Sequence, residues 1–340
     1  MSSRTALLAA SIVLCVVSVG AREVSAQERQ KIRVTIPTPS MMFYPLHYGQ
    51  AKGLFPKEGM DVEVISTNGD GPDVDAVISG SVQFAVSTPN RLFTSFEQGK
   101  PLKAAMMLAK RMAIDCAMNK QVADRLGITP QTPLETRLKA MKGLTVAGTR
   151  PGAFTYVLLE TYGKRVGLVP QKDYQLIGVG GANSMLPALE NNQIAVGCTG
   201  SPFAELAASR GKAIRFTNNM GGDDPAFDDF LFELVYARPD FLQSNGETAR
   251  RFLRAFLASV NEILDTPASA LMPDLKAQYG GAPDDVILES FENTKAVYAR
   301  DGVITPASVQ KAGAFMIESG AIKTAATFDQ VAVNDFLPKR

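Results

Sequence analysis

Between residues 31 and 217, short apolar runs alternate with longer stretches in which apolar residues recur at helical spacing. The short runs predict strands at 32–36, 62–66, 82–87, 102–108, 144–148, 174–179, 194–199 and 213–217. The longer stretches predict helices between them, at 45–53, 73–80, 90–98, 154–166, 183–192 and 202–210. Such alternation is typical of βαβ units in mostly parallel sheets, so the pattern predicts an α/β fold.

The pattern of strands and helices also occurs twice along the chain. An offset of 112 positions aligns 32–104 with 144–216 without a gap, as the printed sequence shows. Identities are few, but the phase of strands and helices is kept, and Pro39 meets Pro151 while Tyr44 meets Tyr156. The repeat therefore predicts two lobes of one topology.

After residue 217 the pattern changes. A loop, "NNMGGDDPAFDD", precedes one further strand-like run at 230–237, and the rest is almost entirely helical, near 246–265, 267–279, 284–299 and 306–319. We expect the run at 230–237 to return the chain to the first lobe, so that two crossings, near 109–113 and 218–238, form a hinge. This divides the chain into lobe I, 27–111 with 236–340, and lobe II, 112–235.

The first 26 residues differ from the rest. Arg4 precedes an apolar stretch over 6–20, and the small residues of 24–26 resemble a cleavage site. We interpret 1–26 as a secretory signal peptide, which predicts a periplasmic protein. Its removal leaves a mature chain of net charge near zero, which argues against nucleic acid or a membrane surface as partner.

Two cysteines, Cys116 and Cys198, remain in the mature chain. An oxidising compartment would permit a disulfide. The sequence does not show that the two residues approach each other, so we expect two buried free thiols, with a disulfide as the alternative.

In open α/β sheets, ligands bind at the carboxyl ends of the strands. That rule selects the loops 37–44, 67–71 and 87–90, facing 149–156, 179–183 and 199–202. The first of these contains "SMMFYP" (40–45), an unusually apolar loop. We expect Met41, Phe43 and Tyr44 to form an apolar wall of a pocket, since methionine adapts to varied shapes; the alternative is a loop packed into the core.

Arg150 lies just before a predicted helix start in "GTRPGAFTY" (148–156). A helix N-terminus beside an arginine is suited to an anion, although an arginine on a solvated loop is equally compatible with the sequence. The glycines of "IGVGGANS" (177–184) suit close approach to a ligand. A dinucleotide is disfavoured because Asn183 stands where the fingerprint needs glycine.

Catalytic and metal-binding motifs are missing from the sequence. It contains no H-E-x-x-H, C-x-x-C, G-x-S-x-G or P-loop pattern, and its one histidine, His47, falls on an apolar helix face. Paired aspartates such as Asp223 and Asp224 stand where acidic residues commonly cap helices. We therefore expect no catalytic residue, no metal and no cofactor.

Four segments resemble landmarks of the NMT1/THI5-like solute-binding proteins: "AKGLFPKEGMDVEVI" (51–65), "DAVISGSVQFAVST" (75–88), "LKAMKGLTVAG" (138–148) and "ALENNQIAVGC" (188–198). The resemblance covers about 31–320. It implies a type II periplasmic binding fold, with two lobes, a two-strand hinge and a ligand trapped between them. Members of that family serve ABC importers of nitrate, sulfonates, taurine and thiamine-precursor pyrimidines.

The resemblance and the loop rule select the same regions. The residues that we expect to bind the ligand are Ser40, Met41, Phe43, Tyr44, Thr88, Asn90, Thr149, Arg150, Ala153, Phe154, Gly181, Asn183, Thr199 and Glu233. Arg150 favours an anionic ligand, whereas Glu233 is the carboxylate that a neutral or cationic pyrimidine would need. Because the chain has no tryptophan, any ring stacking must come from Phe or Tyr.

The function that we expect is capture of a small organic, anionic solute by a monomer and its delivery to an ABC permease in the inner membrane. The alternative within the family is a pyrimidine-binding protein or a synthase-like enzyme. The enzymes of that type carry a CCCF motif, which this sequence does not contain. A third interpretation is that the protein is a sensory binding domain. The sequence does not distinguish a sensing role from a transport role.

Overall fold

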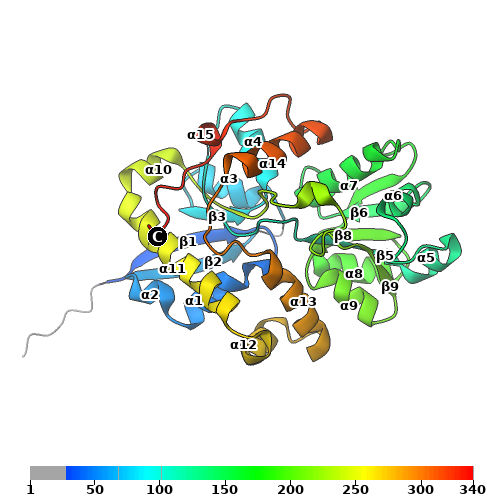
Figure 1. Cartoon of the computed structure of the whole chain (residues 1–340), viewed down its shortest axis with the longest axis horizontal. Helices are drawn as coiled ribbons and strands as arrows, with labels where there is room; N and C mark the ends of the chain where they lie inside the picture. Colours follow the sequence, from blue (N-terminus) through cyan, green and yellow to red (C-terminus); the bar gives the residue numbers. More distant parts are fainter. Residues whose placement is uncertain (1–27, 68, 101, 340) are drawn as a thin grey trace, which may run out of the picture.

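The computed structural model describes residues 28–67, 69–100 and 102–339. The predicted signal peptide, 1–26, lies outside the described residues. Figure 1 shows two α/β lobes side by side, one containing the blue and cyan strands and the other the green strands. Each lobe is built on one five-stranded sheet.

The sheet of lobe I has the order β2-β1-β3-β10-β4. β1 pairs in parallel with β2 and β3, while β10 is antiparallel to β3 and β4. The strands are β1 (Gln30–Ile36), β2 (Met60–Ser66), β3 (Phe84–Ser87), β4 (Lys103–Met107) and β10 (Leu234–Ala237). The helices between them are α1 (Tyr44–Ala51), α2 (Leu54–Lys57), α3 (Pro72–Ile78) and α4 (Pro89–Glu97), and the turn η1 (Met41–Phe43) leads into α1.

The sheet of lobe II repeats this arrangement in the order β7-β6-β8-β5-β9. β6, β7, β8 and β9 take the places of β1, β2, β3 and β4, and antiparallel β5 takes the place of β10. The strands are β5 (Ile114–Asn119), β6 (Thr145–Gly148), β7 (Gln175–Gly178), β8 (Val196–Gly200) and β9 (Ala213–Thr217). The helices are α5 (Lys120–Leu126), α6 (Leu134–Lys139), α7 (Phe154–Arg165), α8 (Ala182–Glu190) and α9 (Phe203–Ser209).

The fold therefore has the two matching α/β units that the repeat predicted. β5 is the strand that the apolar pattern did not predict. All six of its residues are buried, but they include Asp115 and Asn119, which interrupt the apolar run. The side chain of Asp115 accepts the N–H of Asn219 at 2.6 Å through Oδ1, and Asn119 donates to the Leu189 carbonyl at 2.9 Å, so both polar side chains are held by tertiary contacts that the sequence does not display.

The two crossings between the lobes run side by side. The N–H of Leu108 donates to the Glu233 carbonyl at 2.7 Å, the N–H of Phe232 to the Ala109 carbonyl at 3.2 Å, and the N–H of Phe230 to the Lys110 carbonyl at 2.9 Å. Residues 108–110 and 230–233 thus form a hydrogen-bonded two-strand hinge.

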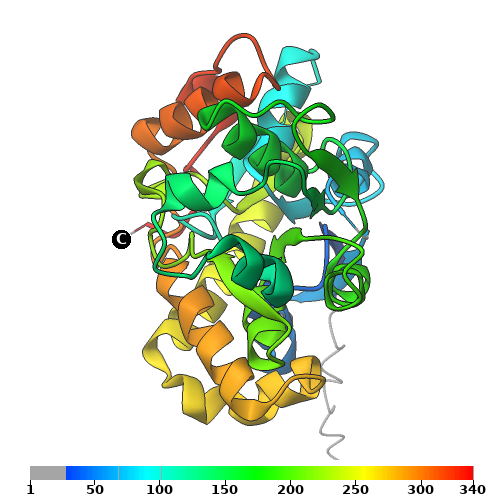
Figure 2. The same cartoon turned by 90° about the vertical axis from the view of Figure 1, so that its right-hand side faces the viewer.

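The C-terminal helices reach both lobes. They are α10 (Pro239–Ser244), α11 (Gly246–Asp265), α12 (Ala268–Tyr279), α13 (Asp284–Val297), α14 (Pro306–Ser319) and α15 (Phe328–Val331), with the turn η2 (Pro225–Phe227) in the second crossing. α11 packs on α1 and α2, whereas α13 also meets α9 and α14 also meets α7. Figure 2, viewed from the side of lobe II, shows these yellow-to-red segments at both ends of the green lobe. The lobe boundaries at 111/112 and 235/236 stay a prediction.

Cys116 and Cys198 form a disulfide, so the expectation of two free thiols was wrong. The two residues lie directly opposite each other in the antiparallel pair of β5 and β8, with their Cα atoms 4.1 Å apart. They are 82 positions apart in sequence, and two strands of the sheet, β6 and β7, lie between them. Their proximity therefore follows from the insertion of β5 beside β8, which the apolar pattern did not reveal.

Candidate ligand-binding site

A cavity lies where the strand ends of the two lobes meet. Its volume is about 40 Å³, which is roughly three times the space that one water molecule needs. Its walls come from both lobes and from the second crossing: Pro37, Thr38, Ser40, Met42, Phe43, Asp70, Thr88, Ala113, Ile114, Thr149, Thr155, Thr199, Gly200 and Glu233. The two walls are in direct contact beside the cavity, since Asn90 of lobe I donates to the Gly152 carbonyl of lobe II at 3.0 Å.

Six of the residues expected to bind the ligand line this cavity: Ser40, Phe43, Thr88, Thr149, Thr199 and Glu233. They come from four loops at the carboxyl ends of β1, β3, β6 and β8, and from the crossing that leads into β10. The loop rule therefore led to the region in which the cavity lies. It did not identify every side chain that reaches the cavity.

Some residues of the apolar loop after β1 line the cavity, and others pack into the core. Met42 and Phe43 line the cavity, but Met41 and Tyr44 do not. The Tyr44 ring packs edge-on against Phe291, with ring centroids 5.2 Å apart, and Met41 and Tyr44 are both fully buried in the main core. Of the wall expected from Met41, Phe43 and Tyr44, only Phe43 lines this cavity, because the tight turn of η1 directs successive side chains to different faces.

The expected anion site at the start of α7 already holds a carboxylate of the protein. The N–H of Phe154 donates to Oδ2 of Asp70 at 2.8 Å, and Asp70 belongs to the loop after β2 of the other lobe. Burial raises the pKa of Asp70, while its hydrogen bonds and the nearby Arg91 and Arg150 act in the opposite direction. An anionic group of lobe I therefore lies where the sequence suggested an anionic ligand.

Arg150 itself packs across the lobe boundary and is not part of the cavity wall. A Cβ atom on Gly69 would lie 2.5 Å from Nε of Arg150, so this close approach depends on a glycine whose φ is +132°. The residue expected to bind the ligand's anion lies instead against the Gly69 backbone and interacts with Asp70.

The other expected residues make contacts around the cavity. Nδ2 of Asn90 donates to the Gly152 carbonyl of lobe II at 3.0 Å, and Ala153 is the buried N-cap of α7. The Phe154 ring stacks on Phe315 at 5.5 Å in an aromatic cluster beside the hinge. Gly181 faces Thr38, and Asn183 lines a separate hollow between α8 and the α12–α13 loop.

Hydroxyl groups supply much of the polar wall. Oγ1 of Thr88 donates toward Oδ2 of Asp70 at 3.0 Å and Oδ1 of Asn90 at 2.6 Å. In lobe II the hydroxyls of Thr149 and Thr155 lie 2.9 Å apart, and the Thr155 hydroxyl also accepts the N–H of Thr149. Such groups can donate or accept, so they adapt to different ligands.

The charged groups of the wall are both acidic. Within the described residues, Asp70 and Glu233 line the cavity and neither Lys nor Arg does. Glu233 is 5% exposed, and its Oε2 has no hydrogen-bond partner in the part of the chain that is described. Burial first, and then the neighbouring Asp70 and Asp73, raise the pKa of Glu233 well above its usual range. Burial, followed by Asp70, also raises the pKa of Asp73 to about 6.

Sequence reasoning did not name Asp70, Thr38, Met42 or Thr155. Asp70 lies in "NGDGPD" (68–73), inside the selected loop 67–71, and an acidic residue between two glycines was the available signal. Thr38 and Met42 lie in the first selected loop, and Thr155 lies in the loop and helix start after β6.

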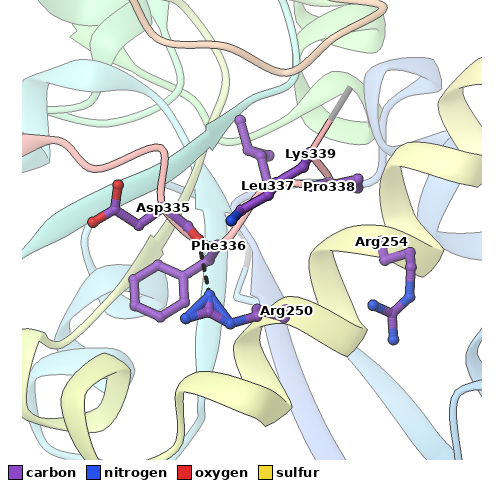
Figure 3. A pocket seen from close by; sticks show the side chains of 7 residues that line it. All are labelled: Arg250, Arg254, Asp335, Phe336, Leu337, Pro338 and Lys339. Carbon is purple, nitrogen blue, oxygen red and sulfur yellow. Dashed lines mark hydrogen bonds between the residues drawn. The ribbon is translucent and has the colours of Figure 1, made fainter.

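A larger hollow lies on the outer face of lobe I between α11 and the C-terminal segment (Figure 3), with a volume of about 630 Å³. Both of its arginines are engaged within the protein. Arg250 donates to the Asp335 carbonyl at 2.8 Å and lies over the Phe336 ring, and Arg254 contacts both oxygens of Glu58. The hollow lies away from the strand ends that face each other, so we do not place the ligand there.

Two further features concern metal binding and membrane-spanning helices in the described residues. Among the described residues, no group of three or more His, Cys, Asp or Glu side chains could hold a metal ion. Within those same residues, no helix combines the length and apolar character needed to cross a membrane.

Two α/β lobes, a two-strand hinge and a cavity between facing strand ends define the class of the periplasmic binding proteins. The chain belongs to the NMT1/THI5 like family, which matches residues 40–270. The Bacillus subtilis (strain 168) protein YtlA, named as a binding protein, is 23% identical over 320 residues, covering 91% of this chain and 89% of YtlA.

Solved structures confirm the fold. The periplasmic nitrate-binding protein NrtA from Synechocystis PCC 6803 superposes with a TM-score of 0.70 at 19% identity, covering 91% of this chain and 87% of NrtA. The alkanesulfonate-binding protein SsuA from Xanthomonas axonopodis pv. citri, bound to MOPS, gives a TM-score of 0.70 at 13% identity, with 90% and 99% covered. The fold also occurs in an enzyme, the desulfurization enzyme DSZB, with a TM-score of 0.62 at 11% identity and coverages of 91% and 97%.

Proposed function

We propose that the protein captures a small organic solute between its lobes in the periplasm and delivers it, as a monomer, to the permease of an ABC importer. The observation that carries this proposal is the cavity itself, which both lobes line at the hinge. Family membership supports it, as do structural neighbours whose names describe periplasmic binding of small solutes.

The contacts across the cavity suggest how capture works. Asn90 of lobe I donates to the Gly152 carbonyl, Asp70 accepts from Phe154, and the N–H of Met41 donates to the Ser201 carbonyl at 3.1 Å. A solute that contacts both walls adds to these bonds only when the lobes are closed. Binding therefore shifts the equilibrium from open to closed, and the permease can distinguish the loaded form by its shape.

The sequence suggested an anionic solute because of Arg150. The structure does not support an anionic solute, since the Asp70 carboxylate occupies the start of α7 and Arg150 is outside the cavity wall. The charge of the solute is taken up in the next subsection.

The second candidate is a pyrimidine-binding protein or a synthase-like enzyme of the same family. It is favoured by one observation, the buried Glu233 carboxylate in the cavity, which could accept hydrogen bonds from an aminopyrimidine. The occurrence of the fold in an enzyme shows that the architecture is compatible with catalysis.

One experiment separates a binding protein from a synthase-like enzyme. The purified mature protein is incubated with each solute that raises its melting temperature, and the solute is then recovered and weighed by mass spectrometry. We expect one equivalent of unchanged solute per chain. Conversion of the solute, with turnover beyond one equivalent, would favour the enzyme and contradict the transport proposal.

A further inference from the structure

We propose that the solute carries a positively charged nitrogen group, a protonated amine or an amidine, which binds in the cavity against the carboxylates of Glu233 and Asp70. This inference rests on the proposed function, because it names the ligand class of the same site. It also reverses the charge that the sequence suggested.

The position of Glu233 carries the inference. Its backbone is fixed in the hinge, where its carbonyl accepts the N–H of Leu108 at 2.7 Å. Its side chain lines the cavity, is 5% exposed, and has an oxygen, Oε2, without a partner among the described residues. A buried carboxylate without a hydrogen-bond donor is costly, and a cationic N–H group of the solute would supply the donor.

The carboxyl groups around the cavity outnumber the guanidinium groups by one. The carboxyl groups that interact here are those of Glu233, Asp70 and Asp73, and the guanidinium groups that reach Asp70 are those of Arg91 and Arg150. The only other titratable group in this set is the phenol of Tyr236, which donates to the Thr88 carbonyl. When all three carboxyl groups are ionised, one negative charge is left over, and a cation bound at Glu233 would balance it.

An anionic solute would meet the opposite situation. It would be placed beside Glu233 and Asp70, without a Lys or Arg in the described wall. The N–H of Phe154, the helix-terminal donor that an anion would use, already donates to Oδ2 of Asp70. Two negative charges placed close together in a buried site repel each other strongly.

The remaining wall defines what else the solute needs. Met42 and Phe43 are apolar, and Thr38, Ser40, Thr149, Thr155 and Thr199 carry hydroxyls. A small solute with one cationic nitrogen and a short apolar portion matches this wall.

Proton release gives this inference a second readout. With the cavity empty, burial and the neighbouring Asp70 and Asp73 favour the protonated form of Glu233, since they raise its pKa. A cation that pairs with the ionised carboxylate would displace that proton. A neutral or anionic solute would not.

The experiment uses matched sets of probes that share a carbon skeleton: propylamine, propanol and propanesulfonate, and benzamidine, benzyl alcohol and benzenesulfonate. Each is tested for its effect on the melting temperature of the wild type, of Glu233→Gln and of Glu205→Gln. Glu205 is the control because it is 3% exposed and lies outside the cavity wall; its Oε1 pairs with Nη2 of Arg215 at 3.3 Å.

We expect the amine or the amidine to raise the melting temperature of the wild type and of Glu205→Gln, and this shift to be lost in Glu233→Gln. Calorimetry of the stabilising probe in buffers of different ionisation enthalpy should show release of up to one proton at neutral pH. Stabilisation by a sulfonate, no stabilisation by either cation, or a shift that persists in Glu233→Gln would each overturn the inference. Stabilisation by a sulfonate would leave the transport proposal intact, whereas conversion of a probe would refute that proposal separately.

Discussion

Phe43 and Met41 lie two residues apart in η1, yet only Phe43 lines the cavity. Both are buried, so truncation of either to alanine should lower the free energy of unfolding by about 2–5 kcal/mol. Because Met41 faces the core, we expect Met41→Ala to keep the melting-temperature shift that a stabilising solute produces, and Phe43→Ala to lose it. Equal loss of the shift in both variants would show that the loop acts on binding only through stability.

Asp115 should make stability depend on pH. Burial, followed by the nearby Glu205, raises its pKa to about 7. Between about pH 4 and pH 7 the folded state then holds a proton that the unfolded state has released, so the free energy of unfolding falls as pH rises. One such group contributes a slope of at most about 1.4 kcal/mol per pH unit.

We expect Asp115→Asn to flatten this dependence, as measured by urea unfolding at pH 4.5 and pH 7. The raised pKa values of Glu233 and Asp73 act in the same direction and should leave part of the slope in the variant. An unchanged slope in Asp115→Asn would show that the pH dependence of stability does not come from Asp115.

Individual side chains were predicted less well than the loops that contain them. The carboxyl ends of parallel strands identify a region, and Phe43, Thr88 and Glu233 reach the cavity from it. Whether a loop residue faces the cavity, the core or the opposite lobe depends on the turn that it adopts and on its neighbours from the other lobe. Arg150 illustrates this, since its position is set by Gly69 and Asp70, far from it in sequence.

The disulfide fastens β5 to β8 in lobe II. Cross-linking residues separated by 82 positions stabilises by roughly 4 kcal/mol in the loop-entropy account. We therefore expect a double variant, Cys116→Ser with Cys198→Ser, to unfold at a lower urea concentration than the oxidised wild type.

Reduced wild type serves as the control and should resemble the double variant. Thiol titration of the unfolded, unreduced protein should find no free thiol on the mature chain. Two reactive thiols, or an unfolding midpoint that reduction does not change, would argue against the bond.

Most strands and helices were predictable, because their apolar periodicity is local. The order of the strands was predictable only in part. The repeat at an offset of 112 positions implies that both lobes share one topology, but β5 and β10 enter their sheets antiparallel, each after a crossing. Their places depend on pairing with strands distant in sequence, and β5 carries polar residues that conceal it.

Hydrogen bonds across the cavity contribute to closure of the two lobes, beside the contacts of α13 and α14 with lobe II. Asn90→Ala removes the donor to the Gly152 carbonyl, a bond worth about 0.5–1.5 kcal/mol. We expect the closed population to fall by up to roughly tenfold and the apparent affinity for a stabilising solute to weaken in proportion. The measurement is a calorimetric titration.

Thr94→Ala is the matched control. Its hydroxyl donates to the Asn90 carbonyl within α4 at 2.9 Å and, in the part of the chain that is described, has no hydrogen bond to lobe II, so this variant should bind like the wild type. Equal weakening in both variants would assign the effect to α4 rather than to closure.

The central claim is that a solute holds the two lobes together and is released unchanged. Small-angle X-ray scattering tests it most directly, with protein stripped of solute by unfolding and refolding and then titrated with a stabilising probe. We predict a larger radius of gyration without solute, and a decrease that is complete at one equivalent. A radius of gyration that does not change while the solute binds would contradict the account.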